Sequence, residues 1–328
     1  MAKKRVLSGI RSTGRLHIGN YLGMVKGMLA LQANPEYEVL FMVADLHAMT
    51  TPFEPNSLKQ SIREVVLDYL AAGLDPNKAS VFIQSQVREH VELSYLFSTI
   101  VSIARLSHLP TYKEKVKQYP QNNTLALLYY PVLMASDILL YKTKVLPVGD
   151  DQLPHLEITR EIARKMNEQY GTNFPEPEQI KTAGHYIPSL TGEGKMSKTT
   201  EGSYINLTDN LEIIKSRLAL SPTDSGKGER VPETGGVANL LTLIELFEGR
   251  EKREKYEKDY KEQGIRYKNL KEELAGAIYT ELEPIQKRRK ELEKNKTYVE
   301  KVLEEGSGKA RIVASQTLKE VKVKMGLI

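Results

Sequence analysis

Two short segments of this chain carry residue types that bind phosphate. In the first, a short apolar strand at residues 6–7 runs into a loop with Gly9 and Gly14, and a helix is expected to follow. Such a turn binds anions, because free N–H groups and the helix dipole both favour negative charge. His17 and Asn20 lie one turn apart at the helix start, so their side chains can face one ligand. The glycines alone are equally typical of an ordinary connection between strand and helix.

The second segment, residues 192–202, places Lys195 and Lys198 in a loop flanked by glycines. Lysines on such a loop can close over a leaving phosphate group and then release it. They would supply positive charge where an in-line displacement at phosphorus accumulates negative charge, and no enzyme nucleophile is needed. Taken alone, a loop rich in glycine and lysine is more often a solvated connection.

Asp137 lies among apolar residues of a predicted helix, with Met134 and Tyr141 one turn away on either side. Burying a carboxylate is costly unless it accepts hydrogen bonds, so Asp137 requires a donor. That donor is either a group of the protein core or an N–H group of a ligand bound in an apolar pocket.

Apolar runs between helix-breaking residues predict a doubly wound α/β domain that positions these groups. Buried strands are expected at residues 38–45 and 79–83, with an amphipathic helix at about 56–72 between them. Such β-α-β units form a parallel sheet whose ligands bind at the carboxyl ends of the strands. The loop that contains Gly14 and the segment that contains His47 would both lie there.

A second α/β half is expected after a helix and a solvated basic loop that occupy residues 88–117. It contains a helix over 129–141 with Pro131 in its first turn, a strand at 145–148 and a further long helix. The acidic turn at 149–152 could accept ribose hydroxyls, or it could serve only as an N-terminal helix cap.

Composition excludes several kinds of chemistry. The chain has 328 residues, of which 40% are hydrophobic and 27% are charged, as in a globular protein. A net charge of +5 indicates no overall polybasic character, and the lack of cysteine excludes disulfides, thiolate catalysis and cysteine-ligated metal sites. The first residues lack the apolar region of a signal peptide and no apolar run approaches a membrane span, so we expect a cytoplasmic protein.

The motifs resemble those of a known family. Residues 17–20 (the HIGN motif) and 195–199 (the KMSKT motif) are similar to the HIGH and KMSKS signatures of class I aminoacyl-tRNA synthetases. The segments SGI-x-x-TG, VADLHA, TYKEK, YYPVLMASDILLY and PVGDDQ extend the resemblance, over the whole chain, to the bacterial tryptophanyl-tRNA synthetases. The resemblance implies activation of L-tryptophan by ATP, transfer of tryptophan to the 3′-terminal adenosine of tRNA(Trp), and a homodimer.

Together with this resemblance, the composition of the chain predicts two domains and a C-terminal helix. Residues 1–209 would form a Rossmann-like catalytic domain with a largely helical insertion at about 50–125. Residues 210–300, where charge runs and helical patterns dominate, would form an α-helical anticodon-binding domain. A C-terminal helix within 301–328, near 309–325, could pack back on the catalytic domain.

The resemblance also assigns an amino acid site. Asp137 would accept the indole N–H of tryptophan and so disfavour phenylalanine, which would leave the carboxylate without a donor. Met134 would pack on the indole, and Tyr130 and Gln152 would hold the amino group. His47 would lie near the polar end of the amino acid.

For ATP, the resemblance implies a site built from both motifs and the acidic turn. Lys115, Lys195 and Lys198 would stabilise charge on the departing pyrophosphate, and His17 and Asn20 would also take part in catalysis. Mg²⁺ would be held by phosphate oxygens and water rather than by a metal site of the protein. The residues implied in nucleotide binding are Arg11, Ser12, Thr13, Gly19, Asn20, Gly149, Asp150, Asp151, Ile187, Lys195, Met196, Ser197, Lys198 and Thr199.

Three positions depart from the family pattern. Ser12 stands where proline is common, Asn20 replaces the second histidine of HIGH, and Thr199 replaces the last serine of KMSKS. None of the three removes a charge.

The alternatives to a tryptophanyl-tRNA synthetase are a tyrosyl-tRNA synthetase, a non-catalytic paralogue that binds RNA or tryptophan, and a small nucleotidylyltransferase. The length and the helical C-terminal part disfavour the last of these.

Overall fold

Five parallel strands form the sheet of this protein in a computed structural model that describes residues 3–12, 14–181, 186–198 and 200–328. The strand order is β3-β2-β1-β4-β5, so the direction of winding reverses at β1. This reversal makes the carboxyl end of β1 the point where ligand crevices form in such sheets. The predicted doubly wound α/β fold is therefore confirmed. The strands are β1 (Lys4–Arg11), β2 (Tyr37–Ala44), β3 (Ala79–Ile83), β4 (Val145–Leu146) and β5 (Glu178–Gln179).

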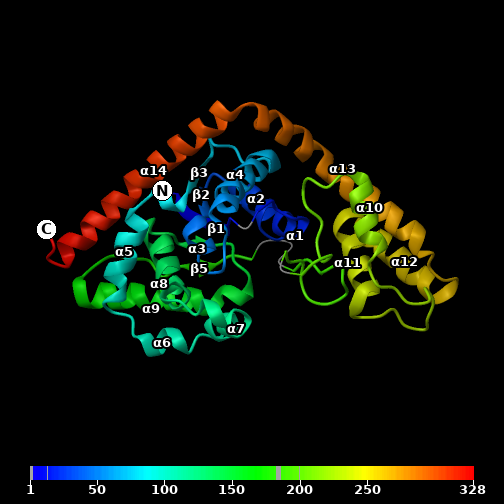
Figure 1. Cartoon of the computed structure of the whole chain (residues 1–328), viewed down its shortest axis with the longest axis horizontal. Helices are drawn as coiled ribbons and strands as arrows, with labels where there is room; N and C mark the ends of the chain where they lie inside the picture. Colours follow the sequence, from blue (N-terminus) through cyan, green and yellow to red (C-terminus); the bar gives the residue numbers. More distant parts are fainter. Residues whose placement is uncertain (1–2, 13, 182–185, 199) are drawn as a thin grey trace.

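Helices surround the sheet and form the C-terminal part of the chain (Figure 1). Those of the first half are α1 (Ile18–Asn20), the π-helical turn η1 (Tyr21–Val25), α2 (Lys26–Ala33), α3 (Asp45–Ala48), α4 (Pro55–Ala72), η2 (Gln84–Gln86), α5 (Glu89–Ser98), α6 (Ile103–Ser107), α7 (Pro110–Gln118), η3 (Pro120–Asn122) and α8 (Leu125–Leu140). Those of the second half are η4 (Asp150–Gln152), α9 (Leu153–Tyr170), α10 (Leu211–Ala219), α11 (Gly235–Glu248), α12 (Arg250–Glu262), α13 (Tyr267–Lys294) and α14 (Lys296–Lys324).

Central strands send alternate side chains into two cores on opposite faces of the sheet. In β2, Phe41 and Val43 belong to one buried cluster, whereas Leu40 and Met42 belong to the other. A strand covered on both faces must be apolar at nearly every position, which is the pattern that predicted it. Helices α2 and α4 cover the first face, and α5, α8 and α9 cover the second.

The first strand is longer than predicted. β1 pairs with β2 residue by residue from Lys4 to Arg11, which faces Ala44, so residues 8–11 are strand rather than loop. Backbone pairing in the parallel ladder outweighs the flexibility of Gly9. The turn that precedes α1 therefore begins only at Ser12.

The predicted bounds of two helices were also wrong. Residues 112–117, predicted as a basic loop, lie in α7, because Pro110 at its first position has a φ angle suited to a helix start. Helix α8 begins at Leu125 rather than 129, because the side chain of Thr124 accepts the N–H of Leu127 and caps the helix. Pro131 is therefore inside α8, and not in its first turn.

The last helix begins at Lys296, well before the predicted start near 309. Gly306 lies inside it because α14 crosses β3 there so closely that a side chain at this position would collide with the carbonyl of Val81. In Figure 1, α13 and α14 run as an arch along one side of the molecule, from the helical part at the right to the C-terminus at the left. The short strand β5 was not predicted.

The helical part shares its core with one face of the sheet. A single buried cluster joins Val6 of β1 and Tyr69 of α4 to Leu218 of α10 and Leu282 of α13. The stretch 50–125, predicted as an insertion, contains the edge strand β3 as well as helices. The division into domains at residues 209 and 300 stays a prediction. No helix in the described ranges combines the length and apolar character needed to cross a membrane.

Candidate active site

The HIGN motif forms the start of α1 as a closed capping box. The Nδ1 atom of His17 accepts the N–H of Asn20 at 3.3 Å, and the Oδ1 atom of Asn20 accepts the N–H of His17 at 3.2 Å. The two side chains thus bind each other's backbone. Burial, together with the charge of Lys198, lowers the pKa of His17 to about 4. At pH 7 the ring is therefore neutral, and because Nδ1 accepts a hydrogen bond, Nε2 carries the proton and can donate it to a ligand.

The turn before α1 contains further residues predicted to bind nucleotide. Ser12 is buried, and its Oγ atom has no hydrogen-bond partner in the described part of the chain. Gly14 has a φ angle of 99°, which side chains rarely adopt. Arg11 is exposed at the end of β1. Thr13, which was also predicted to bind nucleotide, lies outside the described residues.

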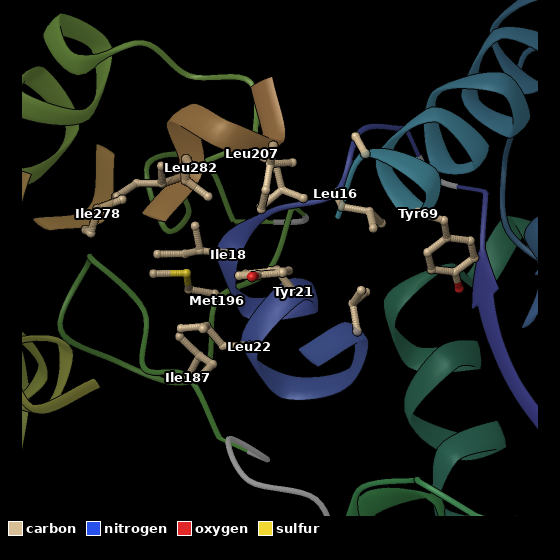
Figure 2. Close-up of a cluster of buried hydrophobic side chains, with 14 of the residues drawn as sticks. Leu16, Ile18, Tyr21, Leu22, Tyr69, Ile187, Met196, Leu207, Ile278 and Leu282 are labelled. Atoms are coloured by element: carbon tan, nitrogen blue, oxygen red, sulfur yellow. The ribbon is translucent and has the colours of Figure 1, made fainter. Parts of the chain in front are cut away.

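The KMSKT motif packs directly against the HIGN motif. A Cβ atom on Gly19 would lie 2.8 Å from the ring of His17 and 3.0 Å from the Cβ atom of Met196, so this approach favours glycine. The N–H of Met196 donates to the carbonyl of Ile187 at 2.9 Å, and both side chains are buried. Figure 2 shows Ile187 and Met196 beside Ile18 and Leu22 of the first motif's helix.

The lysines of this motif lie in different surroundings. Lys195 is exposed, and its Nζ atom lies 3.4 Å from the Oδ2 atom of Asp151. Lys198 is half-buried; burial lowers its pKa to about 8, although the charge of Asp68 opposes the shift. Between them, both backbone polar groups of Ser197 are bound by the hydroxyl of Ser203 at 3.2 and 2.5 Å. Thr199 lies outside the described residues.

The acidic turn lies across from the KMSKT motif. Asp150 accepts a hydrogen bond from Gln179 of β5 at 2.9 Å, which fixes the turn to the edge of the sheet. Asp151 accepts one from Gln152 at 2.9 Å in addition to its contact with Lys195. A Cβ atom on Gly149 would lie 2.6 Å from the carboxylate of Asp151, so a larger residue here would require the side chain of Asp151 to move.

Asp137 occupies the centre of a buried polar cluster. Its carboxylate accepts hydrogen bonds from His47 at 2.7 Å, from His90 at 2.6 Å and from the amide of Gln84 at 2.8 and 3.0 Å. Burial would raise the pKa of this carboxyl, but the attraction of His90 and the two histidine hydrogen bonds outweigh it, and the pKa lies below its usual range. The core thus supplies donors to Asp137, and its role as acceptor for a ligand stays a prediction.

Only some of the other predicted substrate residues lie beside this cluster. The hydroxyl of Tyr130 lies 3.0 Å from Thr111 and 3.0 Å from the Nε2 atom of His155, and its ring contacts that of His47 edge-on. Met134 is half-buried against the core of the second face. Gln152 is bound to Asp151 rather than to this cluster.

Lys115 approaches the same region from α7. Its Nζ atom donates to Gln118 at 3.0 Å and lies 5.6 Å from the ring centre of Tyr119. Burial and the positive charge of Arg11 lower the pKa of Lys115. The positive charge of Arg11 thus acts on Lys115, and an anion bound near both would relieve this repulsion.

Sequence reasoning missed several polar residues of the site, namely Gln84, His90, Thr111 and His155. Gln84 follows β3 directly, and the rule that placed His47 at the end of β2 could have identified it. His90 and His155 are buried on helices, where nothing in the local sequence distinguishes them from core residues. The Nδ1 atom of His155 has no hydrogen-bond partner among the described residues.

The chain is similar to known proteins over its whole length. A family model described as tRNA synthetases class I (W and Y) matches residues 2–283. The tryptophan–tRNA ligase of Rickettsia conorii is 41% identical over 99% of this chain and 99% of its own. That of Caldanaerobacter subterraneus is also 41% identical, over 99% of each chain. The solved tryptophanyl-tRNA synthetase of Campylobacter jejuni, complexed with ADP and tryptophan, matches with a TM-score of 0.85 at 30% identity, covering 98% of this chain and 99% of that one.

Proposed function

The chain belongs to the class I tRNA synthetases of the tryptophan and tyrosine type, and we propose that it is a tryptophan–tRNA ligase. It activates L-tryptophan with ATP to give Trp-AMP and pyrophosphate, and then transfers tryptophan to the 3′-terminal adenosine of tRNA(Trp). The observation that carries the proposal is the contact of the two motifs at the end of β1, where Met196 lies against Gly19 and the charge of Lys198 acts on His17.

We propose that ATP lies between these motifs and the acidic turn. Asp151 would accept hydrogen bonds from the ribose, and Gly149 would allow the nucleotide to approach the backbone. The neutral ring of His17 would donate its Nε2–H to a phosphate oxygen. The Oγ atom of Ser12, which has no hydrogen-bond partner among the described residues, lies close by in sequence. Mg²⁺ would arrive bound to the phosphates, since the described residues hold no cluster of three acidic or histidine side chains arranged for a metal.

In the activation step, the carboxylate of tryptophan attacks the α-phosphorus and pyrophosphate leaves. Negative charge grows on the leaving oxygens, and groups already aimed at that place lower the barrier most. Lys195 reaches the phosphates by exchanging its exposed contact with Asp151, which costs little because exposed ion pairs are weak. Lys198 already lies close enough to His17 to affect its pKa before ATP binds.

We propose that Asp137 selects tryptophan. Indole has one N–H donor and no acceptor, so a carboxylate that only accepts is its natural partner. His47, Gln84 and His90 hold the carboxylate ionised and in one orientation, which prepares it for the ligand. A side chain without a donor would leave the charge less satisfied and would be rejected on binding.

The assembly and the tRNA site are further parts of the proposal. Residues 210–300 would bind the anticodon, with their Lys and Arg side chains on phosphates. Two copies would associate in the cytoplasm through a surface that includes Tyr95 of α5 and Leu125 of α8, which are 70% and 77% exposed. A monomer mass in sedimentation equilibrium would contradict the dimer.

The pH dependence of ATP use tests the role of Lys198. Its pKa of about 8 predicts that kcat/KM for ATP, which reports the free enzyme, falls by about tenfold per pH unit above that value as Lys198 loses its proton. No loss is expected from His17 above pH 5, because its pKa is about 4. Arginine keeps its charge throughout this range, so Lys198→Arg should remove the alkaline fall. The same fall near pH 8 in this variant would assign it to another group.

Amino-acid-dependent ATP–pyrophosphate exchange, measured with each of the twenty amino acids, tests the proposed function. We expect exchange with tryptophan alone. Exchange with tyrosine and not tryptophan would assign the chain to the tyrosine enzymes, which share the fold and both motifs. No exchange with any amino acid would favour a non-catalytic paralogue that binds RNA or tryptophan.

A further inference from the structure

A buried ion cluster joins helix α4 to helix α13. Asp68 of α4 is completely buried, and Arg289 of α13 is 3% exposed. The guanidinium of Arg289 binds the Oδ1 atom of Asp68, the carboxylate of Glu64 at 2.5 Å and that of Glu293 at 3.0 Å. Burying charges is costly even when they are paired, so stabilisation of the fold alone does not account for such a cluster.

The second oxygen of Asp68 binds the backbone next to the HIGN motif. Its Oδ2 atom accepts the N–H of Leu16 at 2.6 Å, one residue before His17. On the other side of the same segment, the carbonyl of Leu16 accepts the N–H of Leu207, and the N–H of Ile18 donates to the carbonyl of Ile205, both at 2.9 Å. Residues 16–18 are thus held from two directions.

Helix α13 also binds the segment around Leu207, which pairs with residues 16–18. The amide of Gln286, one turn before Arg289, donates to the carbonyls of Leu207 and Asp209 at 2.9 Å each. In Figure 2, Ile278 and Leu282 of this helix pack close to Leu207 and Ile18 in the same buried cluster. One face of α13 therefore reaches both the HIGN motif and the chain that leaves the KMSKT motif.

The charge of Asp68 also acts on the KMSKT motif. It raises the pKa of Lys198, against the stronger effect of burial. Lys198 in turn lies close enough to His17 to lower its pKa. The contacts and the charge of Asp68 therefore involve α13, the segment before the HIGN motif and the KMSKT motif together.

We infer that Asp68 and Arg289 are positioning residues of the activation reaction: Arg289 holds the buried carboxylate of Asp68, and Asp68 holds the backbone of Leu16, so that His17 meets ATP in a fixed place. The inference rests on the proposed function. An ion pair that only stabilises the fold would affect ATP and tryptophan use alike, whereas a positioning pair acts on ATP use first.

Two double variants separate these roles. Asp68→Leu/Arg289→Met removes both charges of the buried pair together with the acceptor of Leu16, and Glu64 keeps its contact with Arg15. Asp68→Asn/Arg289→Gln removes the same two charges but keeps an acceptor oxygen. We expect the Leu/Met variant to lose about 10- to 100-fold in kcat/KM for ATP in pyrophosphate exchange. The KM of the Leu/Met variant for tryptophan should stay within about twofold of the wild-type value. The Asn/Gln variant should keep both its kcat/KM for ATP and its KM for tryptophan within about threefold of the wild-type values. Glu293→Gln, which changes only the most exposed of the three carboxylates that bind Arg289, is the control.

Hydrogen exchange of the amide of Leu16 provides a readout that does not depend on activity. It should become faster in the Leu/Met variant and stay protected in the Asn/Gln variant, at a temperature where both are folded. Equal protection and equal kcat/KM for ATP in the two variants would overturn the inference, as would parallel losses for ATP and tryptophan. A wild-type protein without exchange activity would instead refute the proposed function, while the amide measurement still tests whether Asp68 holds Leu16.

Discussion

The Lys195→Ala variant is expected to activate tryptophan about 100 to 1,000 times more slowly than the wild type, the loss typical when one preorganised donor to a transition-state charge is removed. The fold should be unaffected, because the side chain of Lys195 is 61% exposed and its 3.4 Å pair with Asp151 is also exposed. The measurement is the rate of Trp-AMP formation in a single turnover, with thermal unfolding followed in parallel.

Lys258→Ala is the matched control for this variant. Lys258 is a 71% exposed lysine on α12, far along the chain from both motifs, so its loss should leave the activation rate unchanged. An unfolded Lys195→Ala protein would refute the assignment of this segment to a functional loop. An activation rate within about threefold of the wild type would refute the role of Lys195 in stabilising charge.

The Asp137→Asn variant is expected to bind tryptophan about 10 to 100 times more weakly, since a hydrogen bond to a charged group contributes about 1.5–3 kcal/mol. The asparagine amide also points a donor at a place where His47, His90 and Gln84 already donate. ATP lies elsewhere in the proposed site, so its affinity should change by less than about threefold. Calorimetric titration with each ligand separately measures both.

Asparagine is a better test than alanine at this position. Alanine would leave three buried donors without an acceptor and would destabilise the fold, whatever the role of Asp137. Glu89→Gln on α5 changes another buried carboxylate, one that accepts a hydrogen bond from Ser315 of α14 outside the cluster, and should alter neither affinity. Comparable losses of tryptophan and ATP binding in Asp137→Asn would mean that Asp137 is structural.

The parts of the fold that could be predicted are those that local pattern controls. The continuous apolar run of β2 identified a strand covered on both faces, and Gly73, with a φ angle of 115°, ended α4 where the sequence indicated. The start of α14 could not be found in this way. Gly306 looks like a helix breaker in the sequence, and only the closeness of β3 explains why it lies within a helix.

The residues of the site likewise fall into those that local sequence reveals and those that only the packing of the fold brings together. Residues within short motifs, such as His17 and Lys195, could be named from the sequence, since their spacing along the chain carries the signal. His90 could not, because it reaches Asp137 only when α5 packs beside α8. Gln84, which follows β3 directly, was missed although its place at the end of a strand could have identified it. The contact between Asp68 and Arg289 joins residues 221 positions apart, and no local pattern predicts it.

The central claim is that this protein attaches tryptophan to tRNA, and aminoacylation measures it directly. Purified protein, ATP and Mg²⁺ are supplied with labelled tryptophan or labelled tyrosine, each with tRNA(Trp) and with tRNA(Tyr). The account predicts acid-precipitable label with tryptophan and tRNA(Trp) alone, and its loss in Lys195→Ala. Charging of tRNA(Tyr) with tyrosine, or no charging of either tRNA by a folded protein, would contradict it.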